Sequence, residues 1–280
     1  MADRARTYRT QAVILRRRDY GDADRVLTVF TPDRGKLALI GKGIRKTTSR
    51  KAGHLELFTH VSFLAAQART WDIITEAQAI HSFRHLRMDL DAISQASYVA
   101  ELVDAFTQDE DENRLLWDLL LVVLLELDGG VEAGGVEAGG VETGDGKGAK
   151  ADFSVLMRWF DLHLLGLVGF QPELFHCLNC GDDLEPVINY LSVREGGIYC
   201  PRCGEHRGGT EPIEVDELKV LRYLQSRPWA TVRNLTVRPA IMARVENILY
   251  RILITVLERQ LKSVNFMRHV RREHRVSSTE

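Results

Sequence analysis

The stretch QAVILRRRDYGDADRVLTVFTPDRGKLALIGK, residues Gln11 to Lys42, decides the fold of the N-terminal part of the chain. It holds three β-rich runs that two groups of turn residues separate, and two similar runs follow. Five short strands in about 70 residues predict a small closed barrel of the OB-fold type, although an SH3-like barrel gives a similar pattern. The five runs are Gln11 to Arg18, Arg25 to Thr31, Lys36 to Lys42, His54 to Ala65 and Thr70 to Ile80.

A basic segment, DRGKLALIGKGIRKTTSRKAG from Asp33 to Gly53, contains no Asp or Glu after Lys36. Glycine, Ser and Thr between its cations let the backbone approach a polyanion. A phosphate backbone favours such cations where no carboxylate competes. A solvated, disordered loop is the alternative interpretation. The residues predicted to contact DNA phosphates are Arg16, Arg17, Arg18, Arg34, Lys36, Lys42, Arg45, Lys46, Arg50 and Lys51.

Aromatic side chains of the predicted barrel could stack on bases. Phe30 and Phe63 lie within apolar runs, which favours the core for both. Tyr20, beside Gly21, and Trp71 are better candidates for an exposed platform, with a core position as the alternative for each.

Charge is distributed unevenly along the chain, although the net charge is −2. Residues 1–51 carry fourteen Lys and Arg against five Asp and Glu, whereas residues 101–145 carry thirteen acids against Arg114 alone. One face can therefore hold nucleic acid while another repels it or meets a basic partner. The near-neutral total does not argue against DNA binding.

After Phe83 the apolar residues take helical spacing, first over Leu86 to Phe106 and again over Asn113 to Leu127. Residues 129–143, GGVEAGGVEAGGVET, repeat a five-residue period, which predicts a flexible low-complexity insertion over residues 128–151. Apolar helices are expected again over 153–167, 213–224 and 239–261. A basic tail over 266–280 is expected to fray.

The chain contains four cysteines, arranged as Cys177-Leu-Asn-Cys180 and Cys200-Pro-Arg-Cys203 with nineteen residues between the pairs. This spacing is typical of a zinc ribbon, here expected over residues 174–212, in which four thiolates hold one Zn²⁺ tetrahedrally. Disulfides are the alternative, but a cytoplasmic chain keeps its thiols reduced. Because four thiolates leave no position for water, the zinc is expected to be structural.

An enzymatic alternative begins at His54-Leu55-Glu56, which superficially starts the H-x-E…C-x-x-C signature of a zinc deaminase or hydrolase. The first cysteine pair lies more than a hundred residues later and the second pair fills the shell, so a non-enzymatic protein is expected. The N-terminus has no apolar signal region and the longest apolar run, Leu119 to Leu125, cannot cross a bilayer. These features predict a cytoplasmic protein without membrane contact.

Several further segments carry a recognisable pattern when they are taken in order. They are Ala12 to Lys46, Ser49, Leu55 to Phe58, Tyr98 with Glu101-Leu102, Leu164-Leu165 with Gly169-Phe170-Gln171-Pro172, Gly197-Ile198-Tyr199-Cys200 and Arg259 to Ser263. In this order the segments resemble the RecO family of bacterial DNA repair proteins, which are recombination mediators. The resemblance covers nearly the whole chain except residues 128–151 and the tail.

The resemblance implies an α+β multidomain chain: an OB-fold domain over residues 1–82, an α-helical domain over 83–173 and 213–265, and a zinc module inserted between the two helical parts. It also implies binding of single- and double-stranded DNA, annealing of complementary strands and, with RecR, loading of RecA on DNA coated by single-strand binding protein. Nucleoid association in the cytoplasm follows from the same resemblance.

The coating protein's acidic C-terminal tail is a further expected partner, with a docking groove around Arg244, Arg251 and Lys262. The low-complexity insertion departs from the family pattern. Since some family members lack the cysteines, the metal is not expected to have a catalytic role. An OB-fold RNA-binding protein of translation remains an alternative that the barrel alone does not exclude.

Overall fold

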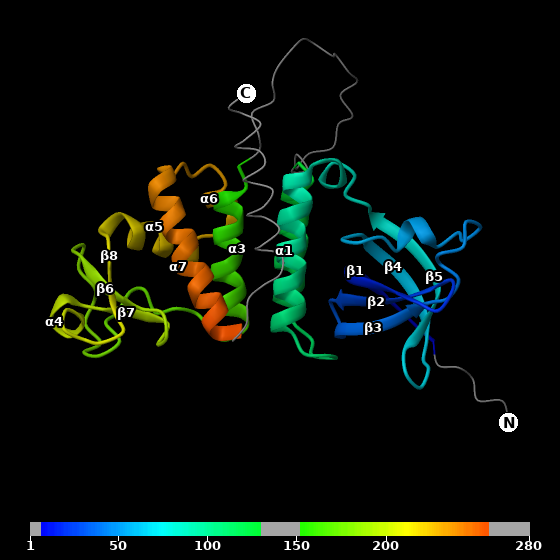
Figure 1. Ribbon diagram of the computed structural model, residues 1–280, viewed down its shortest axis with the longest axis horizontal. Coiled ribbons are helices and arrows are strands. Elements are labelled where there is room, and N and C mark those ends of the chain that lie inside the picture. The colour runs from blue at the N-terminus through cyan, green and yellow to red at the C-terminus, as the bar shows by residue number, and fades with distance from the viewer. Residues whose placement is uncertain (1–6, 130–151, 258–280) are drawn as a thin grey trace, which may run out of the picture.

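The computed structural model of the chain describes residues 7–129 and 152–257. Its three parts lie in a row along the long axis of the molecule (Figure 1). A β-barrel forms one end, a group of helices lies in the middle, and a small sheet that carries the cysteines forms the other end. The predicted insertion and tail lie outside the described residues, apart from the start of the insertion at 128–129.

Five strands close the barrel in the order β1-β2-β3-β5-β4, and every neighbouring pair is antiparallel except β3 with β5. The first half of β1 pairs with β4 and its second half with β2, with a bulge between Ile14 and Arg16. This order is that of an OB-fold and confirms the predicted barrel. The strands are β1 Thr7–Tyr20, β2 Asp24–Thr31, β3 Gly35–Gly41, β4 His60–Ala66 and β5 Asp72–His81.

The fourth run was predicted to begin at His54, which is wrong. His54 ends a short 3-10 helix, η1 (Ala52–His54), and β4 begins at His60. Leu55 turns into the barrel core at 1% exposure, and Phe58 takes a positive φ of 64°, which interrupts an extended chain. Leu55 and Phe58 enter two different core clusters, so the apolar residues of this segment do not come from one strand.

The helical part packs around α3, which contacts α2, α5, α6 and α7. One cluster of buried side chains continues from Val13 and Phe30 of the barrel, through the helices, to Cys177 and Ile198. The three parts therefore share a core. The helices are η2 Leu86–Met88, α1 Leu90–Phe106, α2 Arg114–Leu127, α3 Ser154–Leu167, α5 Val215–Ser226, α6 Trp229–Val232 and α7 Pro239–Leu257.

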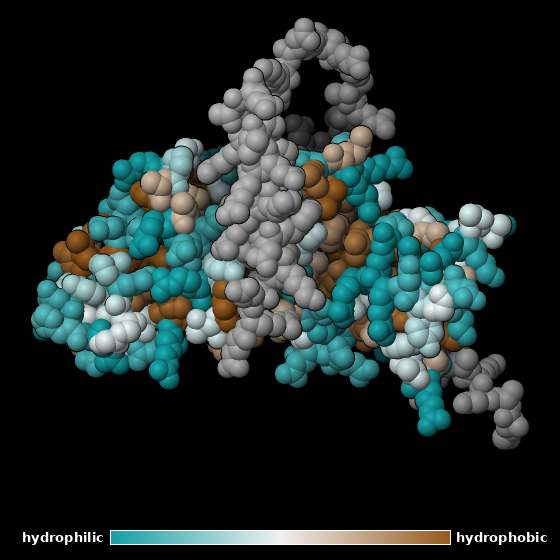
Figure 2. Space-filling view, in the orientation of Figure 1, coloured by the Kyte–Doolittle hydropathy of each residue, from teal (hydrophilic) through white to brown (hydrophobic). Residues whose placement is uncertain are grey.

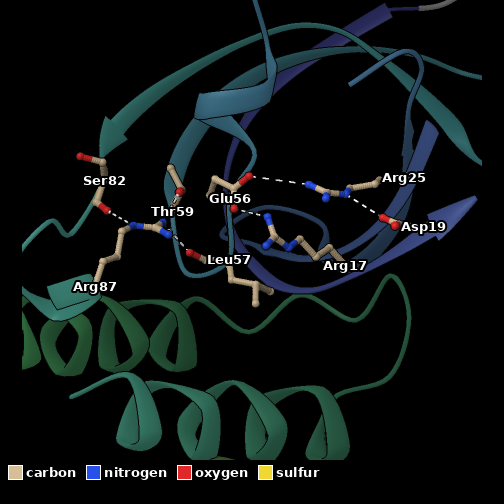
Figure 3. A network of polar contacts seen from close by, with 8 residues as sticks. All are labelled: Arg17, Asp19, Arg25, Glu56, Leu57, Thr59, Ser82 and Arg87. Atoms are coloured by element: carbon tan, nitrogen blue, oxygen red, sulfur yellow. Dashed lines mark hydrogen bonds and ion pairs between the residues drawn. The ribbon is translucent and has the colours of Figure 1, made fainter. Parts of the chain in front are cut away.

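Arg87 of η2 joins the barrel to the helices (Figure 3). Its guanidinium donates hydrogen bonds to the carbonyls of Ser82 (2.6 Å) and Leu57 (2.5 Å) and to Thr59 Oγ1 (2.7 Å). Burial lowers the pKa of Arg87, and the nearby Glu56 carboxylate opposes that shift. This fork fixes the end of the β3–β4 connection against the helices.

The third part lies in the chain between α3 and α5. It holds a sheet of order β7-β6-β8, formed by β6 Asn189–Ser192, β7 Gly197–Tyr199 and β8 Glu211–Ile213, and the short α4 Pro201–Gly204. A Cβ on Gly204 would lie 2.5 Å from Tyr190 Cβ, so only glycine fits there. None of the described helices has the length and apolar character needed to span a membrane.

Candidate nucleic-acid interface and metal centre

The outer face of β1, β2 and β3 presents part of the predicted cation set. Strand alternation places Arg16, Arg18 and Tyr20 on the outer side of β1, where all three are exposed, whereas Arg17 points to the other side. The strand register sets Arg18 beside Val26 of β2, which in turn pairs with Ile40 of β3. The first two or three residues after β3 therefore lie close to the end of β1.

The basic loop that follows β3 is anchored. Ile44 inserts into the barrel core at 2% exposure, and the Arg45 amide donates to the Ala23 carbonyl at 2.9 Å. The amide of Gly43, which has a positive φ of 66°, donates to Asp24 Oδ1 at 2.7 Å. These bonds give the loop a defined conformation against the β1–β2 turn, so the alternative of a solvated, disordered loop does not hold for its first half.

Three cations of this loop are exposed without a carboxylate partner among the described residues: Lys42, Lys46 and Arg50. Arg18 is also exposed, and its guanidinium carbon lies 5.6 Å from the ring centroid of Trp71. Arg69, in the β4–β5 loop, is exposed as well and was absent from the predicted set. We call Arg18, Lys42, Lys46, Arg50 and Arg69 the basic face.

Lys36 has a structural role, which removes it from the predicted set. Its Nζ donates to the carbonyls of Asp104 and Thr107 at 2.7 Å each and lies 3.3 Å from the Asp104 carboxylate. Only 13% of its side chain is exposed. Lys36 therefore ties β3 to the end of α1 and cannot reach a phosphate.

Four other predicted cations are partly or wholly committed within the protein. Arg17 pairs with Glu56, which also lies 3.7 Å from Arg25 (Figure 3). Arg45 Nε lies 3.3 Å from Asp19. Lys51 Nζ donates to the Ile74 carbonyl at 2.7 Å, and burial lowers the pKa of Lys51. Arg16 Nε lies 3.6 Å from the Asp104 carboxylate, but 68% of the Arg16 side chain is exposed. Solvent screens such a pair, so this ion pair is weak.

Arg34 is separated from Lys42. It lies in the β2–β3 turn, with its guanidinium carbon 4.1 Å from the Tyr8 ring centroid. The seven residues of β3 lie between this turn and Lys42, a span of roughly 20 Å. The backbone of the acidic loop at 109–112 abuts the same turn, since Glu110 donates its amide to the Lys36 carbonyl at 2.9 Å. The ten predicted cations therefore do not form one surface.

Figure 2 shows that hydrophilic residues cover most of the barrel in this view, whereas apolar residues gather over the helices and parts of the cysteine module. The barrel surface in this view is therefore polar, and the sign of its charge follows from the individual residues named above.

The four cysteines meet at one point. Their Sγ atoms all lie within 4.8 Å of one another, and Cys180 Sγ and Cys200 Sγ are 3.8 Å apart. A tetrahedral zinc with Zn–S bonds of about 2.3 Å needs sulfur atoms about 3.8 Å apart. The four residues therefore fit a zinc ion, and all four cysteines are free thiols rather than disulfides.

Backbone amides stabilise the thiolate form of Cys177. The Cys200 amide donates to Cys177 Sγ at 3.3 Å. Burial alone raises the pKa of the Cys177 thiol, but amide donors from Cys180, Cys200 and Asn179 outweigh it and lower the pKa to about 6. A thiolate is the form that binds metal, so this environment supports a metal ligand.

Two family models match the chain. Recombination protein O N terminal matches residues 4–83, and Recombination protein O C terminal matches residues 87–136 and 147–265. The chain belongs to the recombination protein O (RecO) family.

The curated relatives agree with this assignment. The DNA repair protein RecO of Roseiflexus sp. strain RS-1 is 37% identical, over 98% of this chain and 90% of that protein. The DNA repair proteins RecO of Dehalococcoides mccartyi strain BAV1 and Pelotomaculum thermopropionicum are each 33% identical, covering 94% and 93% of this chain and 96% and 93% of their own length. These names denote DNA repair rather than a catalytic activity, in agreement with the expectation of a non-enzymatic protein.

The deaminase alternative is wrong for this RecO-family chain. His54 and Glu56 lie in the barrel part, where His54 Nδ1 accepts the Ala79 amide at 3.2 Å and Glu56 pairs with Arg17. His176, next to Cys177, has both ring nitrogens 3.3 Å from carboxylates. The possible metal cluster within residues 7–129 and 152–257 consists of the four cysteines alone.

The structure does not support the expected docking groove for an acidic tail around Arg244, Arg251 and Lys262. Arg244 Nε lies 3.1 Å from Glu217 and Arg251 Nη1 lies 2.6 Å from Glu211, so both cations already have partners. Lys262 lies outside the described residues.

Proposed function

We propose that this chain is a DNA repair and recombination mediator that binds single- and double-stranded DNA through the basic face and anneals complementary strands. With RecR it helps to load RecA on DNA coated by single-strand binding protein, whose acidic tail it also binds. It acts in the cytoplasm at the nucleoid. Membership of the RecO family supports this proposal.

The observation that carries the proposal is the set of unpaired cations in the anchored loop. Lys42, Lys46 and Arg50 have no carboxylate partner in the described part of the chain, and Lys42 directly follows β3, one of the strands whose face carries nucleic acid in OB-folds. Each can contact a phosphate without reading a base. Annealing needs this chemistry, because two polyanionic strands must approach while their bases stay free to pair.

In this proposal the metal has a structural role. Zinc held by Cys177, Cys180, Cys200 and Cys203 cross-links the two knuckles and has no coordination position for water. One zinc ion per chain is expected. The cysteine module lies at the end of the molecule opposite the barrel (Figure 1), so it does not contribute to the basic face.

A strand-annealing assay, with and without single-strand binding protein, tests the proposal. A Lys42→Ala/Lys46→Ala/Arg50→Ala variant should anneal complementary oligonucleotides roughly tenfold or more slowly, because three phosphate contacts are lost. The matched control is Arg194→Ala/Lys219→Ala/Arg233→Ala, which removes the same charge from exposed residues outside the barrel. Equal loss in both variants would contradict the proposal. Tighter binding to RNA than to DNA of one sequence would favour the RNA-binding alternative.

A further inference from the structure

Tyr20 and Trp71 meet at the surface of the barrel although fifty residues of chain lie between them. Their ring centroids are 5.2 Å apart with an interplanar angle of 81°, an edge-to-face arrangement. In such a pair at least one ring keeps both of its faces clear of its partner. Tyr20 is 48% exposed and Trp71 is half-buried.

The two rings do not serve the hydrophobic core. Neither residue belongs to the two clusters of buried side chains or to the partly buried residues packed against them. Burial of apolar area therefore does not explain why two large aromatic residues lie side by side on the outer face of the barrel.

The β4–β5 turn holds Trp71 in a fixed position. The next residue, Asp72, accepts the Ala68 amide at 3.0 Å and the Tyr8 hydroxyl at 2.8 Å. A platform that is already ordered loses little entropy when a ligand binds.

Arg18, Arg69 and Lys42 lie near the pair, whose neighbours also include Asp24, the cross-strand partner of Tyr20, and Asp72. The Arg18 guanidinium carbon lies 5.6 Å from the Trp71 ring centroid, and Arg69 precedes Trp71 by two residues in an exposed turn. Tyr20 pairs with Asp24, and Lys42 continues β3 beyond Gly41, which pairs with Arg25. Tyr20 and Lys42 are therefore two strand spacings apart, roughly 10 Å.

We propose that Tyr20 and Trp71 form a stacking site for one unpaired base of single-stranded DNA, whose flanking phosphates meet Lys42 and Arg69. The inference rests on the proposed function and adds a preference for unpaired strands. Every base has a π-face, so the site is tolerant of sequence. Bases of an intact duplex are stacked on their neighbours and cannot enter it. Holding one base leaves the neighbouring bases free to pair during annealing.

Binding of a labelled single-stranded oligonucleotide and of the matching duplex to full-length Tyr20→Ala and Tyr20→Phe variants tests the site. Tyr20→Ala should weaken single-strand binding by about fivefold or more, because stacking of one base is lost. Its affinity for duplex and its salt dependence should stay within about twofold of wild type, since no charge is removed. Tyr20→Phe keeps the ring and should bind as wild type does.

Fluorescence gives a readout that a purely structural role would not change. A base stacked at the site should quench the fluorescence of Trp71. Single-stranded DNA should therefore quench the tryptophan fluorescence of wild type more than that of a Trp71→Phe variant of comparable affinity.

The outcomes separate the inference from the proposed function. If Tyr20→Ala binds single strands as wild type does while the Lys42/Lys46/Arg50 variant is weakened, the stacking site is refuted and DNA binding by the basic face stands. An equal loss for duplex and single strand in Tyr20→Ala would also refute it. If wild type binds no DNA, both fall.

Discussion

At the residue scale, a cation's partner decides what it can do. Lys36 and Lys42 both belong to the acid-free segment around β3, yet one is buried against α1 and the other is exposed. The partner of Lys36 lies 68 residues away in sequence. Local sequence does not distinguish the two residues, so the predicted set of ten mixed surface and structural cations.

Replacing Lys36 by Met should destabilise the fold and spare DNA binding. Two partly buried carbonyls, of Asp104 and Thr107, lose their donor, which costs about 1–3 kcal/mol of unfolding free energy. Denaturant unfolding measures the loss, and the salt slope of DNA binding should be unchanged. Lys42→Met is the matched control, with near-wild-type stability and a flatter slope. The reverse pattern would show that the two roles are exchanged.

His60 should make stability depend on pH. It is buried in the barrel–helix contact, stacked 5.9 Å from His81 and edge-on to Trp117, and burial lowers its pKa to about 4. The unfolded chain takes up this proton near pH 6.5 and the folded chain only near pH 4, so stability is lost as pH falls through that window. His60→Gln should lose about 1–3 kcal/mol less than wild type between pH 7 and pH 4. Parallel stability profiles would contradict this assignment.

At the element scale, the spacing of apolar residues and the positions of turn residues predicted most of the strands and helices. Glycine- and proline-containing turns separate β1, β2 and β3 where predicted, and the helices over 153–167 and 213–224 appear as α3 and α5 within two residues. Over residues 54–59 the prediction is wrong because Leu55 and Leu57 alternate with polar residues as in a strand, whereas the chain buries Leu55 and Phe58, three positions apart. The contact of Tyr20 with Trp71 depends on barrel closure, in which β5 pairs with β3, and no local pattern encodes it.

Gly204→Ala should disrupt the second cysteine knuckle. The added Cβ would lie 2.5 Å from Tyr190 Cβ and 2.9 Å from Tyr199 Cβ, so backbone must move beside Cys203. We expect a loss of about 1–3 kcal/mol in stability and a weaker hold on zinc. Gly208→Ala, where nothing lies within 4 Å, is the control and should behave as wild type. Thermal unfolding measures the loss of stability, and the rate of zinc release to a chelator measures the hold on zinc. Equal results for Gly204→Ala and Gly208→Ala would contradict close packing at the second knuckle.

At the scale of the whole molecule, the basic face and the four cysteines lie at opposite ends of one continuous core (Figure 1). The core cluster includes Cys177 and Cys200, so the metal site contributes to the stability of the helices. The basic face lies on the barrel, which has a second core cluster of its own around Ile14, Leu27 and Phe63. Stability and DNA contact should therefore respond to different perturbations.

Removal of zinc should lower the melting temperature and leave the barrel's DNA contacts in place. Structural zinc contributes directly to folding free energy, so chelation should lower Tm by several degrees or more. At a temperature where the chelated chain is still folded, its affinity for single-stranded DNA should remain within about threefold of the zinc-loaded chain. A complete loss of binding on chelation, with the barrel intact by circular dichroism, would place DNA contacts at the metal end.

The most direct test of the basic face is the salt dependence of single-stranded DNA binding in wild type and in the Lys42→Ala/Lys46→Ala/Arg50→Ala variant. Each phosphate contact contributes about 0.7 to the slope of log affinity against log salt concentration, so the variant should lose roughly two units of slope. The Arg194→Ala/Lys219→Ala/Arg233→Ala control should keep the wild-type slope. A slope that stays at the wild-type value in the loop variant would contradict the assignment of these cations to the DNA phosphates.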